Sequence, residues 1–123
     1  SRVDLVRDAA AQVRAAPGEI VFDAVEYWRR PEVLCLVARV LPPSLDALVG
    51  QLRAGLAARG FEPESRPFRA HLTLARKVHA PVAVVPFQPL SWPVADFALV
   101  ESITDRSGSV YTPLATWPLL GGA

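Results

Sequence analysis

The sequence predicts an α+β fold in which helices pack on a mostly antiparallel sheet, and three observations support this. Apolar residues recur at helical spacing near residues 4–14 and 44–59. Five further runs are apolar or alternating, and turn residues bound them. Their order along the chain is helix, two strands, helix, strand and hairpin, which is typical of a layered α+β domain. The 123 residues are expected to form a single domain over 1–123.

The first half of the chain is predicted to contain a helix, a hairpin and a second helix. Residues 4–14 repeat apolar side chains on one helical face, and Pro17-Gly18 ends that helix. Residues 19–28 alternate in part and are predicted to form one strand, although Val21 and Val25 break the alternation. A turn at 29–31 leads to a continuous apolar strand over 33–40.

The second helix is predicted to begin with Ser44 as its N-cap and to end at Gly60. A strand is expected over 70–78. The stretch 81–93 is rich in proline, which cannot donate to a strand ladder, and is predicted to be irregular or an edge strand. Strands over 97–103 and 109–117 complete the chain as a hairpin, with its turn at 105–108.

The amino-acid composition limits the kinds of molecule that the protein is expected to bind. Hydrophobic residues make up 51% and charged residues 20% of the chain, and the net charge is +1, so no strong overall attraction to nucleic acid is expected. Any RNA contact must come from local groups. The single Cys35 is predicted to be a buried apolar side chain, which agrees with a reducing compartment and a cytoplasmic protein. No apolar run reaches membrane-spanning length.

The most informative segment is His71-Leu72-Thr73-Leu74-Ala75-Arg76. Alternation in a strand places His71 and Thr73 on one face, roughly 7 Å apart, and the two leucines on the other. An imidazole can move a proton near neutral pH, and a hydroxyl can bind a phosphoryl oxygen. The alternative is a surface histidine and a threonine present for its β propensity.

The longer segment 68–76, Phe-Arg-Ala-His-Leu-Thr-Leu-Ala-Arg, resembles the second signature of the two-histidine phosphoesterases. Within them it is most similar to the RNA 2′,3′-cyclic phosphodiesterases, also called 2′-5′ RNA ligases. The resemblance continues upstream through 58–61 and 64–68. Downstream, Glu101-Ser102 and Tyr111 match the closing hairpin of that family.

The resemblance implies roles for several side chains. His71 would activate water, and Thr73 would hold a phosphate oxygen. Substrate contacts are expected from Arg76, Phe68 and Arg69. Arg66, like Arg69, could line the same mouth, and the alternative for both is an ordinary surface arginine. By strict alternation Arg76 points away from His71, so a phosphate contact needs a bulge, and a structural ion pair is the alternative.

Four aromatic residues and Glu101 each have two possible interpretations. The aromatic residues could stack on a nucleobase or pack in the core: Phe68, Trp28, Tyr27 and Phe22. Glu101 could orient a group of the site or be structural.

One departure from the family pattern is that this chain contains a single His-x-Thr motif. Members carry two such motifs in a bilobal, pseudo-symmetric fold, whereas this chain has two histidines, and His79-Ala80-Pro81 has no hydroxyl residue at the third position. We therefore expect the chain to correspond to the C-terminal two-thirds of that fold. The N-terminal strand, the first helix and the first motif would be missing.

The sequence thus predicts an enzyme that hydrolyses 2′,3′-cyclic phosphate ends of RNA by metal-free acid–base catalysis, with no cofactor. Its partner would be RNA or a nucleotide. The fragment would be inactive alone, and its uncovered sheet could contact another chain. The alternative is a noncatalytic module of the same fold that binds nucleotide ends or a protein. A metallohydrolase is disfavoured because no His, Asp or Glu cluster has ligand spacing.

Overall fold

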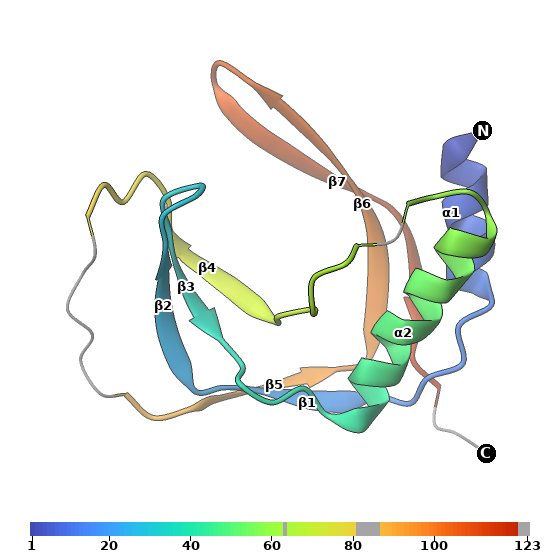
Figure 1. Cartoon of the computed structure of the whole chain (residues 1–123), viewed down its shortest axis with the longest axis horizontal. Coiled ribbons are helices and arrows are strands. Elements are labelled where there is room, and N and C mark those ends of the chain that lie inside the picture. The colour runs from blue at the N-terminus through green and yellow to red at the C-terminus, as the bar shows by residue number, and fades with distance from the viewer. Residues whose placement is uncertain (63, 81–86, 121–123) are drawn as a thin grey trace.

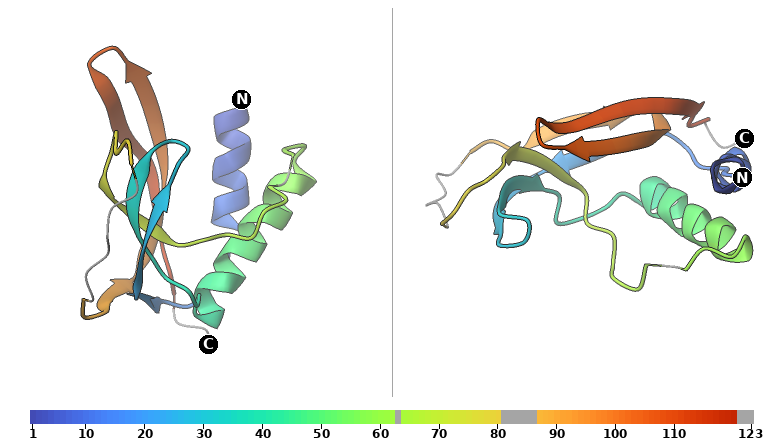
Figure 2. Two further views of the ribbon diagram at one scale, coloured as in Figure 1. Left: turned by 60° about the vertical axis from the view of Figure 1, so that its left-hand side comes forward. Right: turned by 90° about the horizontal axis from the view of Figure 1, so that it is seen from above.

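The computed structural model describes residues 1–62, 64–80 and 87–120, in which two helices accompany seven strands. The strands form three antiparallel sheets with the orders β1-β5, β2-β3-β4 and β6-β7. The helices stand together on one side of the molecule and the three-stranded sheet on the other (Figure 1). The view from above in Figure 2 shows the same separation. The α+β prediction is confirmed.

Helix α1 (Arg2–Ala11) begins at a capping box, in which Asp4 N–H donates to the Ser1 side chain over 3.2 Å. It ends before the predicted residue 14. Ala9 and Ala10 are buried, and Ala9 lies so close to helix α2 (Pro43–Ala58) that a Cβ on Gly55 would sit 3.4 Å from the Ala9 Cβ. The two helices therefore pack through small residues.

The predicted N-cap of α2 is wrong. The cap is Pro42, and Pro43 occupies the first turn, where its missing N–H costs no hydrogen bond. Ser44 lies over β1 (Gly18–Phe22) instead, where a Cβ on Gly18 would come within 2.5 Å of its Oγ. The predicted end at Gly60 is confirmed. Gly60 has φ +89°, and the N–H of Phe61 bonds to the carbonyl of Leu56 over 3.0 Å.

The single strand predicted over 19–28 is two strands in two different sheets. The chain breaks at Asp23, between β1 and β2 (Ala24–Trp28). The Asp23 N–H donates to Val37 O over 3.0 Å, and its carboxylate accepts from the Arg39 N–H and Nε at 3.1 and 3.2 Å. The change of sheet explains why Val21 and Val25 do not follow one alternation.

Strand β5 (Leu90–Val94) lies inside the proline-rich stretch and pairs with β1, with Pro93 opposite Glu19. The edge-strand interpretation is therefore confirmed for these residues, while the part of the prediction that falls on 81–86 lies outside the described residues. Strand β3 (Val33–Val37) forms the predicted hairpin with β2. The connecting turn contains a cis Arg30–Pro31 peptide bond.

The core centres on β3, which lies between β2 and β4 (His71–Ala75). Cys35 and Val37 are fully buried, and Val33 is nearly so. On the opposite face of the sheet, Leu36 packs with Phe22, Ala38 and Ala70. The buried position of Cys35 confirms the sequence prediction.

The final hairpin pairs β6 (Asp96–Asp105) with β7 (Gly108–Pro118), and both strands are longer than predicted. At the turn, Asp105 accepts the Ser107 N–H over 2.8 Å, and Gly108 adopts φ +126°. The rings of Phe97 and Trp117 stack with centroids 5.4 Å apart. In the described part of the chain, neither helix combines the length and apolarity needed to cross a membrane.

Candidate active site

Strand β4 carries the His-x-Thr motif on the central sheet. Its pairing with β3 sets His71 opposite Val37, Leu72 opposite Leu36 and Thr73 opposite Cys35. Leu72 packs on the cluster around Phe22. The other face of the strand therefore presents His71, which is exposed, and Thr73, which is half-buried.

A bulge changes the alternation directly after Thr73. Cys35 pairs with Thr73, but the next pair is Leu34 with Ala75, so Leu74 is one extra residue on β4. Leu74 was predicted to share the buried face of Leu72, and it is instead 51% exposed. Because the bulge shifts the alternation by one residue, Arg76 falls on the face of His71 and Thr73. Its Nη2 donates to the Tyr111 hydroxyl over 3.3 Å.

The imidazole of His71 is held by two neighbours. Its Nδ1 lies 3.1 Å from the carbonyl oxygen of Arg69. The Trp28 ring lies beside it, with centroids 4.7 Å apart and planes inclined by 54°. A proton on Nδ1, donated to that carbonyl, leaves Nε2 with a free lone pair. This tautomer suits a general base.

Glu26 forms hydrogen bonds with Arg69 and Trp28, the two residues that contact the His71 imidazole. The Arg69 guanidinium donates two hydrogen bonds to the Glu26 carboxylate, at 2.8 and 2.6 Å. The Trp28 indole N–H donates to the same carboxylate over 3.0 Å. Hydrogen bonds first from Arg69 and then from Trp28 hold the pKa of Glu26 below its usual range, and the pKa of Arg69 is raised.

The Arg69 guanidinium is engaged by Glu26, and its predicted contact with substrate stays a prediction. Sequence reasoning did not single out Glu26. The two residues are 43 positions apart, and only the strand register places Glu26 opposite Cys35 and on the face of Thr73.

Thr73 keeps its hydroxyl close to the surface of the site. Its Oγ1 lies 4.0 Å from the Cys35 Sγ, a weak contact that leaves the hydroxyl free to donate to a phosphoryl oxygen. Cys35 lies opposite Thr73 on β3 and is fully buried.

An open pocket of about 640 Å³ lies directly beside His71. It is formed by the end of β2, by α2 and by the segment that leads into β4. The residues that line it are Trp28, Arg30, Arg53, Glu64, Arg66, Pro67, Phe68, Arg69 and His71.

Of the four aromatic residues considered for stacking, Trp28 and Phe68 line this pocket, and Phe68 is 47% exposed. Phe22 is buried in the core, so the packing interpretation holds for it. The Tyr27 hydroxyl donates to the Val78 carbonyl over 2.6 Å, which gives Tyr27 a structural role.

The candidate Glu101 and the remaining histidine, His79, lie outside the pocket. Glu101 is exposed on β6, opposite Thr112. The Nδ1 of His79 is 2.7 Å from a Glu32 carboxylate oxygen in the β2–β3 turn. Within residues 1–62, 64–80 and 87–120, no three His, Cys, Asp or Glu side chains lie close enough to hold a metal ion.

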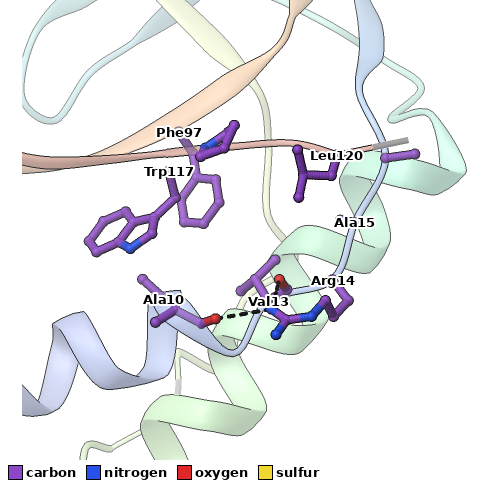
Figure 3. Close-up of a pocket in the computed structure, with 10 residues that line it drawn as sticks. Ala10, Val13, Arg14, Ala15, Phe97, Trp117 and Leu120 are labelled. Atoms are coloured by element: carbon purple, nitrogen blue, oxygen red, sulfur yellow. Dashed lines mark hydrogen bonds between the residues drawn. The ribbon is translucent and has the colours of Figure 1, made fainter. Parts of the chain in front are cut away.

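A second pocket, of about 510 Å³, lies between the end of α1 and the β6–β7 hairpin (Figure 3). Phe97, Trp117 and Leu120 face Val13 across it. Arg14 stands at its edge, where its Nη1 donates to the carbonyls of Ala11 and Val13. Its lining is largely apolar and does not contain His71 or Thr73.

A sheet that presents an imidazole and a hydroxyl beside an arginine-rich pocket is suited to binding a phosphate group and moving a proton. The chain belongs to the LigT-like phosphoesterase family, whose model matches residues 38–111. The resemblance inferred from the motif is thereby confirmed.

Two relatives carry the name RNA 2′,3′-cyclic phosphodiesterase. The Escherichia coli K12 protein is 33% identical over 112 residues, which are 89% of this chain and 63% of that protein. The Thermus thermophilus protein is 47% identical over 58 residues, which are 46% of this chain and 29% of that protein. The chain therefore spans less than two thirds of the length of these curated relatives.

Solved structures show the same fold. A crystal structure described as a phosphoesterase superimposes with a TM-score of 0.85 at 30% identity, over 97% of this chain and 69% of the other. The crystal structure of E. coli LigT complexed with 3′-AMP gives 0.82 at 30% identity, over 96% of this chain and 68% of the other.

Proposed function

We propose that the protein hydrolyses the 2′,3′-cyclic phosphate ends of RNA to 2′-phosphomonoesters, without a metal ion or other cofactor. The observation that carries this proposal is the open face of β4. There, His71 is held through Nδ1, and the Thr73 hydroxyl is available. The names of the two curated relatives support the same reaction.

In the proposed reaction His71 Nε2 takes a proton from water, and the water oxygen attacks phosphorus. The bond from phosphorus to the 3′-oxygen breaks, which leaves a 2′-phosphate and a 3′-hydroxyl. Thr73 donates to a non-bridging oxygen, where charge develops in the transition state. Arg76 contributes positive charge on the same face, because the bulge at Leu74 brings it there.

The leaving 3′-oxygen needs a proton from an acid on the opposite side of phosphorus. His71 cannot serve both sides at once, and His79 is paired with Glu32. As the two-motif pattern of the family implies, we propose that this acid is a second histidine outside these 123 residues, in the other half of a two-lobed fold, and we expect the chain alone to be inactive. We also propose that 1–123 is a single domain and that the protein acts in the cytoplasm.

The test is hydrolysis of a nucleoside 2′,3′-cyclic phosphate in excess EDTA by the full-length protein. His71→Ala should lower the rate by the roughly 10²–10⁴-fold typical of a lost general base. His79→Ala is the matched control and should leave the rate unchanged. A near-wild-type rate for His71→Ala removes His71 from the mechanism. Activity that EDTA abolishes and zinc or magnesium restores overturns the metal-free proposal. Binding of RNA ends without turnover would favour the noncatalytic alternative.

A further inference from the structure

We propose that the pocket beside His71 is a second nucleotide subsite, which binds the nucleotide on the 5′ side of the RNA end. The proposal rests on the proposed function and adds to it a binding site for the nucleotide that precedes the RNA end. Three segments of the chain converge there. They are the end of β2, the middle of α2 with Arg53, and the stretch with Arg66 and Phe68 that leads into β4.

Positive charge is concentrated in this pocket. The whole chain is almost neutral, with 13 basic and 12 acidic residues. The pocket is lined by four arginines and by one acidic residue, Glu64. Such a local excess of guanidinium groups is suited to a phosphodiester, because each group can donate two parallel hydrogen bonds to phosphate oxygens.

Three of these arginines are available to a ligand. Within the described ranges, Arg30 and Arg53 make no ion pair. Arg66 pairs with Glu64 at 3.1 Å, but both side chains are largely in solvent, at 84% and 52% exposure. An ion pair that exposed is weak, so a phosphate can compete for Arg66. Arg69 is the exception, since Glu26 holds it on both nitrogens.

Phe68 gives the pocket an aromatic surface. Phe68 is 47% exposed, and it lines the pocket together with Arg66 and Arg69. Aromatic rings beside arginines are the usual platform for unpaired nucleobases, which stack on the ring while cations follow the backbone. Trp28 is already turned towards the imidazole, so Phe68 is the ring assigned to the base.

The position and size of the pocket fit one more nucleotide. His71 lines the same pocket, so a phosphate held at His71 would border it, and in this proposal the preceding nucleotide occupies the pocket. Its volume of about 640 Å³ falls within the roughly 300–1,000 Å³ usual for small-molecule sites.

The test measures binding, so that it does not depend on turnover. A fluorescein-labelled RNA trinucleotide ending in a 2′-phosphate is titrated with the 123-residue chain and followed by anisotropy. An unlabelled nucleoside 2′-phosphate competes in a parallel series. The trinucleotide should bind at least about fivefold more tightly, as the stacking of one base implies.

Arg53→Gln and Phe68→Ala should each remove most of that preference and leave the affinity for the mononucleotide unchanged. Arg106→Gln, in the exposed β6–β7 turn, is the matched control and should change neither affinity. Circular dichroism checks that the variants are folded. Equal affinities for the two ligands overturn the subsite, and so do equal losses on both ligands. Tight trinucleotide binding with no hydrolysis by the full-length protein would instead count against the proposed function alone.

Discussion

Arg76 donates a hydrogen bond to the Tyr111 hydroxyl and so joins the end of β4 to the β6–β7 hairpin. The two residues meet because Leu74 is an extra residue between two strand pairs. If Leu74 instead took a regular place in the strand ladder, Arg76 would lie on the face of Leu72, which packs on the core. The position of the Arg76 guanidinium therefore depends on the bulge in β4, and the motif sequence alone does not predict it.

Arg76→Ala is predicted to weaken binding of a 2′-phosphate end, because the bulge at Leu74 places the guanidinium on the face of His71 and Thr73. The loss should be about tenfold, as expected for a hydrogen bond to a charged group. The control is Leu74→Ala, which keeps the residue count and should bind as the wild type does. Titration of both variants with a nucleoside 2′-phosphate measures this. Wild-type affinity of Arg76→Ala would disprove the assignment.

Glu26 is predicted to make the surroundings of His71 sensitive to acid. Hydrogen bonds from Arg69 and Trp28 lower its pKa in the folded state. A carboxyl with a lowered pKa contributes stability that is fully present above its unfolded pKa, about 4.3, and is lost as the pH falls through the lower folded value. Below pH 4 the Trp28 indole N–H resonance should therefore shift.

Glu26→Gln should remove that acid transition and shift the Trp28 resonance already at neutral pH, because the amide cannot accept both Arg69 bonds as a charged group. Asp4→Asn is the control, since the pKa of Asp4 is also lowered, through its bond to Ser1, but Asp4 lies in the first turn of α1. An unchanged titration of the Trp28 signal in Glu26→Gln would show that Glu26 does not control this cluster.

Val37 is predicted to be a major contributor to stability. It is fully buried in the central strand, opposite His71, whereas Val40 is 76% exposed three residues later. Val37→Ala should lower the free energy of unfolding by roughly 1.5–3 kcal/mol, and Val40→Ala should change it by less than about 0.5 kcal/mol. Urea unfolding of the 123-residue chain measures both. Equal midpoints for the two variants would contradict the placement of the core.

The chain alone is predicted to be inactive and to self-associate through its hairpin. Ile103 and Val110 are direct strand partners and are 56% and 60% exposed. Sedimentation velocity should show association that rises with concentration and falls in Ile103→Lys. Val40→Lys is the control and should behave as the wild type does. A monomeric chain that hydrolyses a cyclic phosphate would refute the prediction of inactivity.

Local sequence signals predicted most elements of the fold. Gly60 ends α2 as predicted, because a positive φ after the last turn suits glycine. Apolar runs located the β2–β3 and β6–β7 hairpins, and the family motif located β4. These features depend on residues close together in the chain.

The features that were missed depend on contacts between distant residues. Asp23 divides a strand because Val37 and Arg39 hold it, and Ser44 fails to cap because it lies over Gly18. The pairing of Arg69 with Glu26 requires the strand register, as does the bulge at Leu74. No pattern of neighbouring residues encodes a register between strands that are tens of residues apart.

The break at Asp23 also has a mechanical meaning. Strands β1 and β2 are one run of backbone that belongs to two sheets, so the angle between those sheets is set by the dihedral angles of a single residue. Arg39, two residues after the end of β3, holds that residue by two hydrogen bonds to its carboxylate. Asp23 therefore connects the two sheets directly. A displacement of the β1–β5 sheet would pass through Asp23 to β2, which lies on the other side of β3 from the strand that carries His71.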